Sequence, residues 1–286
     1  MLEMNFKNDW KDYLQRKVQE FGYLYDESLN LKTNTIRYFS ALRKFAPRER
    51  KTYQSKTLTV SPAIRSGFNE IVRRLENGEE IKPYLSRNTK VFSRNDLLLN
   101  DWGISHFHLG SCMEPDGYIK RTDFLLYAML TEDSAFLLRI SGHGHWTNTE
   151  LIQILHDNWP HVLQAQKTGF SPKHLTVEAR KALRKHHSNS TVTVSDGTSY
   201  LPLGGGITLS GDCIFDILKT DQVFAEIEDL EEIVIDNKDN LFEAAKIDKN
   251  EALTIRLAFA SEEWYLFEPE KGIRFDIFRQ PTSSSH

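Results

Sequence analysis

The chain lacks the features that mark the common secreted and membrane-bound classes of protein. Its 286 residues include only two cysteines, Cys112 and Cys213, which excludes the disulfide scaffold of small secreted domains. No apolar run approaches the roughly 20 residues of a membrane-spanning helix, and the polar start predicts no signal peptide. We therefore expect a cytoplasmic protein with free thiols and no membrane contact.

The sequence also lacks the usual motifs of nucleotide-binding proteins and serine hydrolases. The glycine run 204–206 has neither the lysine-serine pair of a Walker loop nor G-x-G-x-x-G spacing, and a flexible hairpin bend is its expected role. Ser195 and Ser210 lie near glycines, but neither belongs to a G-x-S-x-G motif. We find no internal repeat and no low-complexity segment.

Charge is present in both signs but is distributed unevenly along the chain. Residues 1–95 hold 19 Lys and Arg against 11 Asp and Glu, whereas residues 212–286 hold 8 against 18. A basic front and an acidic rear are typical of contact with a polyanion at one end. The alternative, that both ends are only solvated surfaces, stays open.

Apolar periodicity predicts an α+β fold with three consecutive regions. Residues 1–92 form a basic, mainly helical region, because apolar residues recur there at spacings of three and four. Residues 93–170 form a central histidine-rich antiparallel meander with flanking helices, made of strand-length apolar runs at 104–110, 123–130 and 135–146. Residues 171–286 form an acidic region of antiparallel strands and helices. Ser93 is the expected cap of a short helix that Gly103 ends.

The histidines are concentrated in one part of the sequence. Nine of the ten fall between positions 106 and 187, and four of them form two H-x-H pairs, His106/His108 and His143/His145. Because side chains on a strand alternate between faces, each pair places both imidazoles on one face. If the first and third apolar runs share a sheet, both pairs face the same cleft.

Such a cleft supports general acid–base catalysis, because imidazole gains and loses a proton near neutral pH. Cleavage of RNA by internal 2′-hydroxyl attack needs two such groups and a cation. We expect Arg121 to supply that cation beside the four histidines. Further substrate contacts are expected from the central region and from the basic front: Lys120, Tyr127, Arg139, Trp146, Arg65, Arg73 and Arg74.

Two other interpretations of the histidines remain open. Three or four neutral imidazoles also suit zinc or another divalent transition metal, with His106, His108, His143 and His145 as ligands. The glutamate that a cupin-like metal site would add is not found at a matching spacing. Alternatively, the histidines are hydrogen-bonded structural groups without a chemical role.

The run RTDFLLYAMLTEDSAFLLRISGHGHW, within residues 104–147, resembles the C-terminal hairpin of RelE/ParE-type bacterial toxins. Arg121, Tyr127, Arg139, Gly142 and His143 fall at places comparable to the arginine, aromatic and Gly-His positions of that hairpin. The resemblance implies a small twisted antiparallel sheet behind N-terminal helices and, in the RelE branch, cleavage of mRNA without a metal. The block DWGISHFHLG is also similar to segments of bacterial proteins without an assigned function.

The leading hypothesis is therefore a bacterial, metal-independent ribonuclease of toxin or phage-defence type, without a cofactor. In this hypothesis the basic region binds RNA, and the acidic C-terminal region restrains the activity or binds a protein partner. The first alternative is a non-enzymatic interaction module, such as an antitoxin or adaptor. The second is a histidine-ligated metal protein.

Overall fold

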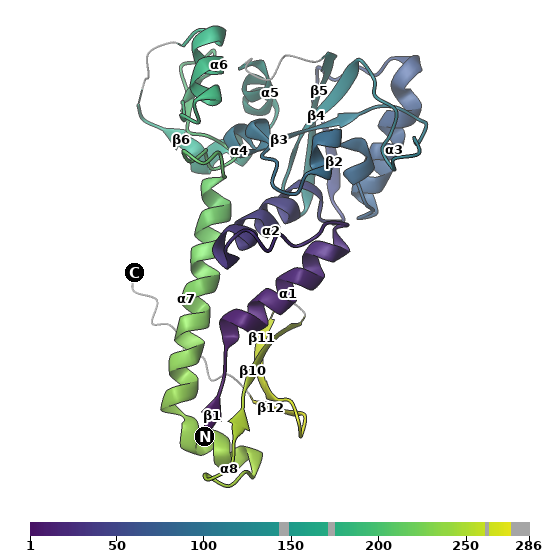
Figure 1. Cartoon of the computed structure of the whole chain (residues 1–286). Helices are drawn as coiled ribbons and strands as arrows, with labels where there is room; N and C mark the ends of the chain where they lie inside the picture. Colours follow the sequence, from purple (N-terminus) through teal and green to yellow (C-terminus); the bar gives the residue numbers. More distant parts are fainter. Residues whose placement is uncertain (143–148, 171–174, 261–262, 276–286) are drawn as a thin grey trace. The chain divides into compact units, whose positions relative to one another are not determined.

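The computed structural model describes residues 1–142, 149–170, 175–260 and 263–275, and the statements below concern these residues (Figure 1). The fold is of the mixed α+β class, as predicted. Among the described residues, every helix is too short or too polar to span a bilayer.

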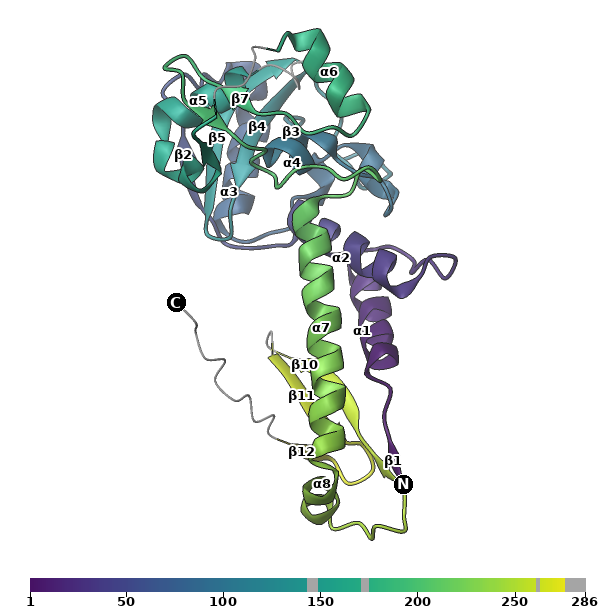
Figure 2. The same ribbon diagram turned by 90° about the vertical axis from the view of Figure 1, so that its left-hand side faces the viewer.

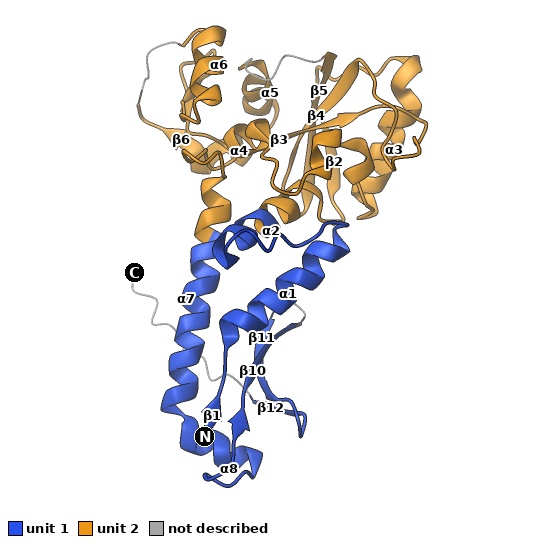
Figure 3. Ribbon diagram, viewed as in Figure 1, with its two compact units in different colours: residues 1–38, 219–286 blue, residues 39–218 orange. Residues whose placement is uncertain are grey.

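The chain divides into two compact units that differ from the three consecutive regions expected from the sequence. Unit 1 comprises residues 1–38 and 219–286, and unit 2 comprises residues 39–218 (Figure 3). Their boundaries fall within helices α2 (Leu31–Phe45) and α7 (Ile214–Asp236). The difference arises because the first helix packs against strands from the end of the chain, a pairing that local periodicity does not reveal.

Unit 2 is built on a four-stranded sheet with the order β2-β5-β4-β3. Strands β3 (Ile104–His108), β4 (Phe124–Leu130) and β5 (Ser134–Gly142) form the predicted antiparallel meander. Strand β2 (Lys51–Gln54) lies parallel to β5 at the sheet edge. Residues 131–133 make the turn between β4 and β5, where the Thr131 amide donates to the Ser134 carbonyl at 2.9 Å.

The two faces of this sheet are covered by different helices (Figure 1). One face carries Ile104, Leu125 and Tyr127 into a core shared with α4 (Leu97–Trp102) and α5 (Glu150–Asn158). On the other side, α3 (Arg65–Glu76) crosses close to the end of β3, where a Cβ on Gly67 would lie 2.1 Å from the Leu109 carbonyl oxygen. Glycine is therefore required at this crossing.

Shorter elements complete unit 2. The predicted helix near residue 180 is α6 (Val177–Lys185), and Thr176 caps it by accepting a hydrogen bond from the Ala179 amide. A small sheet has the order β6-β8-β7. Its strands and the 3₁₀ helices are β6 (Lys167–Thr168), β7 (Val192–Thr193), β8 (Ser199–Tyr200), η1 (Pro62–Ile64), η2 (Lys82–Tyr84), η3 (Arg87–Lys90) and η4 (Pro160–Gln166).

In unit 1, α1 (Phe6–Glu20) contacts the first strand of an antiparallel sheet and lies beside α7 (Figure 2). The Lys7 ammonium pairs with the Glu228 carboxylate of α7 at 2.9 Å. Trp10 and Tyr13 stack with ring centroids 5.1 Å apart. The other elements are β1 (Leu2–Glu3) parallel to β9 (Leu253–Thr254), α8 (Lys238–Ala245), and the sheet of β10 (Arg256–Ala260), β11 (Glu263–Glu268) and β12 (Ile273–Phe275).

The glycine run after β8 is a close backbone contact, not the flexible bend expected from the sequence. A Cβ on Gly204 would lie 2.1 Å from the Leu99 carbonyl oxygen and 2.6 Å from that of Asn100. The Gly204 amide also donates to the Asp101 carbonyl at 2.9 Å. The loop is thus held directly against α4.

We predict that Gly204→Ala destabilises the protein by about 1–3 kcal/mol. The added methyl group clashes with backbone atoms, which cannot move away by a side-chain rotation. Gly169→Ala is the matched control, since no atom lies within 4 Å of the methyl group that it adds. Chemical denaturation of both variants measures the difference. Equal free energies of unfolding for the two variants would contradict the close approach.

Candidate functional site

A cleft of about 680 Å³ opens in unit 2, within the size range of small-ligand and substrate sites. Its walls come from the end of α2, the segment around η3, the start of α4, strand β3 and helix α6. The lining residues are Lys44, Ser86, Asn88, Thr89, Arg94, Asn95, Asp96, Leu97, Leu98, His106, Val177, Glu178, Lys181, Arg184 and Lys185.

Positive charge dominates this lining. Five of the lining side chains are Lys or Arg, whereas Asp96 and Glu178 are the carboxylates among them. Lys181 and Lys185 are exposed and lie one helical turn apart, so both project from the same side of α6. A concave site with this excess of cations attracts anionic groups and concentrates them.

His106 lies in the middle of β3 and forms part of the cleft wall. His106 is 7% exposed, and the centroid of its ring lies 6.3 Å from that of Tyr127 on the neighbouring strand. The register of β3 and β4 places the two residues directly opposite each other. The imidazole is thus held on a rigid strand and not on a loop.

A carboxylate approaches the imidazole from α4. Asp96 caps this helix, and its Oδ1 accepts hydrogen bonds from the amides of Leu98 and Leu99 at 3.1 Å each. Its Oδ2 lies 4.0 Å from His106 Nδ1. At that separation the carboxylate and the imidazole do not form a direct hydrogen bond with each other. The two groups therefore lie side by side in the wall of the cleft.

Helix α6 packs against the rest of unit 2 through two buried arginines and not through an apolar stripe. The Arg184 guanidinium donates to Asp101 Oδ2 at 2.7 and 2.9 Å, and both residues are buried. It also lies 4.4 Å above the Trp102 ring. Arg180 donates to the Thr191 carbonyl at 3.1 Å. Burial raises the pKa of the Asp101 carboxyl, although Arg184 opposes that change.

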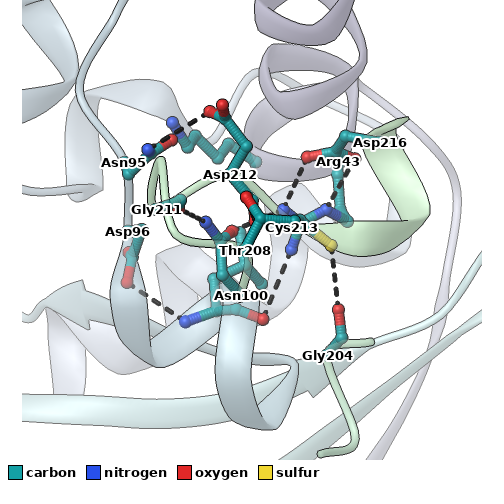
Figure 4. A network of polar contacts seen from close by, with 12 residues as sticks. Arg43, Asn95, Asp96, Asn100, Gly204, Thr208, Gly211, Asp212, Cys213 and Asp216 are labelled. Atoms are coloured by element: carbon teal, nitrogen blue, oxygen red, sulfur yellow. Dashed lines mark hydrogen bonds and ion pairs between the residues drawn. The ribbon is translucent and has the colours of Figure 1, made fainter. Parts of the chain in front are cut away.

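A second polar network supports the wall behind Asn95 and Asp96 (Figure 4). Arg43 Nη2 donates to Asp216 Oδ2 at 2.8 Å and to Asn100 Oδ1 at 2.6 Å. Asn100 Nδ2 in turn donates to the Gly211 carbonyl at 3.0 Å. The network ties α2, α4, the glycine-rich loop and the start of α7 together, so the cleft wall has a fixed position.

Cys213 belongs to this network and not to the cleft lining. Its thiol donates to the Gly204 carbonyl at 3.0 Å, and burial raises the pKa of the thiol. A thiol with a raised pKa is a poor nucleophile, so Cys213 has a structural role. Cys112 is exposed.

The histidines expected to converge have different outcomes. His108 shares a face of β3 with His106 but is 3% exposed and lies outside the described lining of the cleft. His143, His145 and Trp146 lie outside the described residues. Strand β5 ends at Gly142, opposite Phe124. The convergence of the two pairs stays a prediction.

The other expected residues of the central region lie apart from the described cleft lining. Lys120 and Arg121 are exposed on the segment that leads into β4. Tyr127 is fully buried, its hydroxyl donates to the Gly142 carbonyl at 3.3 Å, and burial raises its pKa. Arg139 pairs with Glu150.

The expected RNA contacts of the basic front lie on α3. Arg73 and Arg74 both pair with Glu70 on the same helix at 2.8 Å, and Arg73 also pairs with Glu79. These arginines lower the pKa of Glu70 to about 2. Arg65 donates to the Val60 carbonyl at 2.8 Å. Much of the positive charge of this helix is therefore balanced locally.

The described residues contain no cluster of three or more His, Cys, Asp or Glu side chains suited to a metal ion. The metal hypothesis requires His143 and His145, which are not described, so it stays a prediction.

Sequence reasoning missed most of the cations that line the cleft. Lys44 comes from the end of α2, and Arg94 from the segment before α4. Lys181 and Lys185 are the cations that the sequence could have indicated, because they lie four residues apart on a predicted helix that also bears Arg184. Asp96 was identifiable as a helix cap, but its approach to His106 depends on how α4 packs against β3.

The chain matches no family model, and neither the curated proteins nor the solved structures contain a significant match to it.

We predict that Arg184→Met destabilises the protein by about 3–5 kcal/mol at pH 7, because it leaves the buried Asp101 carboxylate without its guanidinium. A carboxyl whose pKa is higher in the folded than in the unfolded state binds more protons when folded. Stability of the variant therefore rises as the pH falls from 7 toward 4.

Urea denaturation at several pH values measures this effect, with Arg184→Met/Asp101→Asn as the compensating variant. The double variant should recover part of the loss and lose the pH dependence. A single variant as stable as the parent at pH 7 would contradict the account.

Proposed function

We propose that unit 2 binds single-stranded RNA in the basic cleft and cleaves it without a metal, with His106 as a proton-transfer group. The observation that carries the proposal is the presence of one histidine among five cationic side chains in a single cleft. RNA brings the phosphate charge that such a lining attracts. It also brings the 2′-hydroxyl that serves as an internal nucleophile.

The roles of the residues follow from their positions. Lys181 and Lys185 contact phosphates, since they are exposed along one side of α6. His106 removes the proton of the 2′-hydroxyl, and the nearby Asp96 charge stabilises the imidazolium that forms. Lys44 lies deeper in the wall of the cleft and stabilises the negative charge of the phosphorane, whereas Arg184 is paired with Asp101 and holds α6 in position. His143 and His145 are the candidates for protonating the leaving oxygen.

The RelE/ParE-type resemblance stays an expectation, and two features of the fold are compatible with the part it has in this proposal. The meander β3-β4-β5 is the kind of small antiparallel sheet that the resemblance implies. Helices also precede it in the chain, although β2 adds a parallel strand at the edge. A toxin or phage-defence role, with the acidic end of the chain as a restraint, remains part of the proposal.

One observation favours a second candidate, an interaction module that binds RNA without cleaving it. His106 and His108 are both more than nine-tenths buried, as expected of structural histidines. The cations of the cleft bind phosphate in either case. Cleavage by the wild-type chain therefore separates the two candidates.

We predict that Lys181→Ala/Lys185→Ala weakens RNA binding and flattens its salt dependence. Each phosphate contact to a single strand contributes about 0.7 to the slope of log affinity against log salt, so the slope should fall by roughly 1.4. Fluorescence anisotropy with a labelled oligoribonucleotide at several salt concentrations measures it. The control is Lys219→Ala/Lys238→Ala, two exposed lysines far along the chain. An unchanged slope in the cleft variant would rule out the cleft as the phosphate site.

For catalysis, we predict that His106→Ala and His106→Gln lower RNA cleavage in the presence of EDTA by about 10²- to 10⁴-fold. RNA affinity should change little, because the cations remain. His161→Ala, an exposed histidine on η4, is the matched control. If wild-type protein binds RNA but cleaves none in any assay, the interaction module is the better account. If both His106 variants cleave at the wild-type rate, His106 has no catalytic role.

A further inference from the structure

Unit 1 contains a separate pocket of about 380 Å³ between α1 and the strands β10 and β11, and the proposed ribonuclease reaction does not use it. Six of its thirteen lining residues are aromatic, and two aspartates and two arginines are among the others. The rings are Trp10, Tyr13, Phe259, Trp264, Tyr265 and Phe267, and the charged residues are Asp9, Asp12, Arg16 and Arg256.

The aromatic residues fall into two groups. Trp10 and Tyr13 are buried and stack on each other, and the Trp264 ring lies 5.4 Å from that of Trp10. Tyr265 and Phe267 are half-buried on the opposite face of β11, with ring centroids 6.0 Å apart. The first group is packed together, whereas Tyr265 and Phe267 keep part of their surface exposed.

Strand register explains why there is room beside the second group. Tyr265 is paired with Ala258 across β10 and β11, and Phe267 is paired with Arg256. Paired residues share a face of the sheet, so the small Ala258 side chain leaves one flank of Tyr265 uncovered. The Arg274 guanidinium lies 4.4 Å from the Tyr265 ring centroid and limits how the ring can turn. A flat ligand ring fits such a surface.

The charged residues favour a neutral ligand with both donors and acceptors. The Asp9 carboxylate is already engaged within the protein, since it accepts a hydrogen bond from the Leu257 amide at 2.8 Å and pairs with Arg256 at 2.5 Å. Asp12 is 44% exposed at its side chain and lies 3.3 Å from Arg256. Arg16 is exposed one turn further along α1. Two carboxylates balance two guanidinium groups, so neither a simple cation nor a simple anion is favoured.

We propose that this pocket binds a nucleobase, stacked on Tyr265 and read at its edge by Asp12 and Arg16. Carboxylates accept hydrogen bonds from the exocyclic amines of bases, and guanidinium groups donate to their carbonyl oxygens and ring nitrogens. Aromatic side chains stack on any base. The base belongs either to a free nucleoside or to an unpaired position of an RNA strand, and the pocket chemistry is the same for both.

The test is isothermal titration of the full-length protein with each of the four ribonucleosides and with a single-stranded oligoribonucleotide. The pocket variants are Tyr265→Ala and Asp12→Asn. The control is Asp221→Asn, an aspartate of the same unit that pairs with Lys32 outside the pocket. We expect at least one nucleoside to bind and Tyr265→Ala to weaken that binding by about 10-fold, the scale of one lost stacking contact. Thermal unfolding of each variant establishes that it is folded.

The two sources of the base give different results. The natural ligand is a free nucleoside if a nucleoside binds the pocket but Tyr265→Ala leaves the affinity for the oligonucleotide unchanged. Loss of oligonucleotide affinity on Tyr265→Ala, also in the Lys181→Ala/Lys185→Ala background, indicates a base of RNA held independently of the cleft. The proposal is overturned if folded Tyr265→Ala and Asp12→Asn proteins bind all these ligands as the parent does. It is also overturned if tetramethylammonium binds the pocket and the nucleosides do not.

Discussion

The buried ion pair between Arg184 and Asp101 is the contact on which the candidate site depends. It joins α6 to the end of α4 across 83 residues of sequence, with the Trp102 ring beneath the guanidinium. Removing two charges from water is costly, and the two hydrogen bonds and the aromatic face offset that cost only when both partners are present. Since Lys181 and Lys185 are carried on the same helix, their position over the cleft depends on this pair.

The location of positive charge in the folded chain differs from its distribution along the sequence. The basic front suggested an RNA-binding surface on α3, yet Arg73 and Arg74 are paired with carboxylates of their own helix and loop. The cations of the cleft come from separate parts of unit 2, including α6 in the central and nearly neutral stretch. Net charge by segment therefore did not predict where cations gather in the folded chain.

The sequence predicted local features well and distant ones poorly. The meander of β3, β4 and β5 followed from apolar runs of strand length, and Gly103 ends α4 with φ of 69°, as predicted. The cap of α4 is Asp96 and not Ser93, because the Asp96 carboxylate reaches two amides of the first turn.

What the sequence could not predict depends on contacts between distant segments. The parallel pairing of β2 with β5 and the approach of Asp96 to His106 have no local signature. The role of Gly204 depends in the same way on the backbone of α4. For the candidate site, the prediction that His106 lies on a strand is confirmed and its role stays a prediction, whereas the cations around it could be found only in the folded chain.

The most direct test of the central claim is the NMR response of His106 and of the α6 amides to a 2′-O-methylated oligoribonucleotide, which binds but cannot be cleaved. The account predicts that the His106 ring signals and the amides of Lys181 and Lys185 shift together, with one dissociation constant that rises with salt. Shifts confined to α3 or to the exposed segment at Lys120 and Arg121, with His106 unchanged, would contradict it.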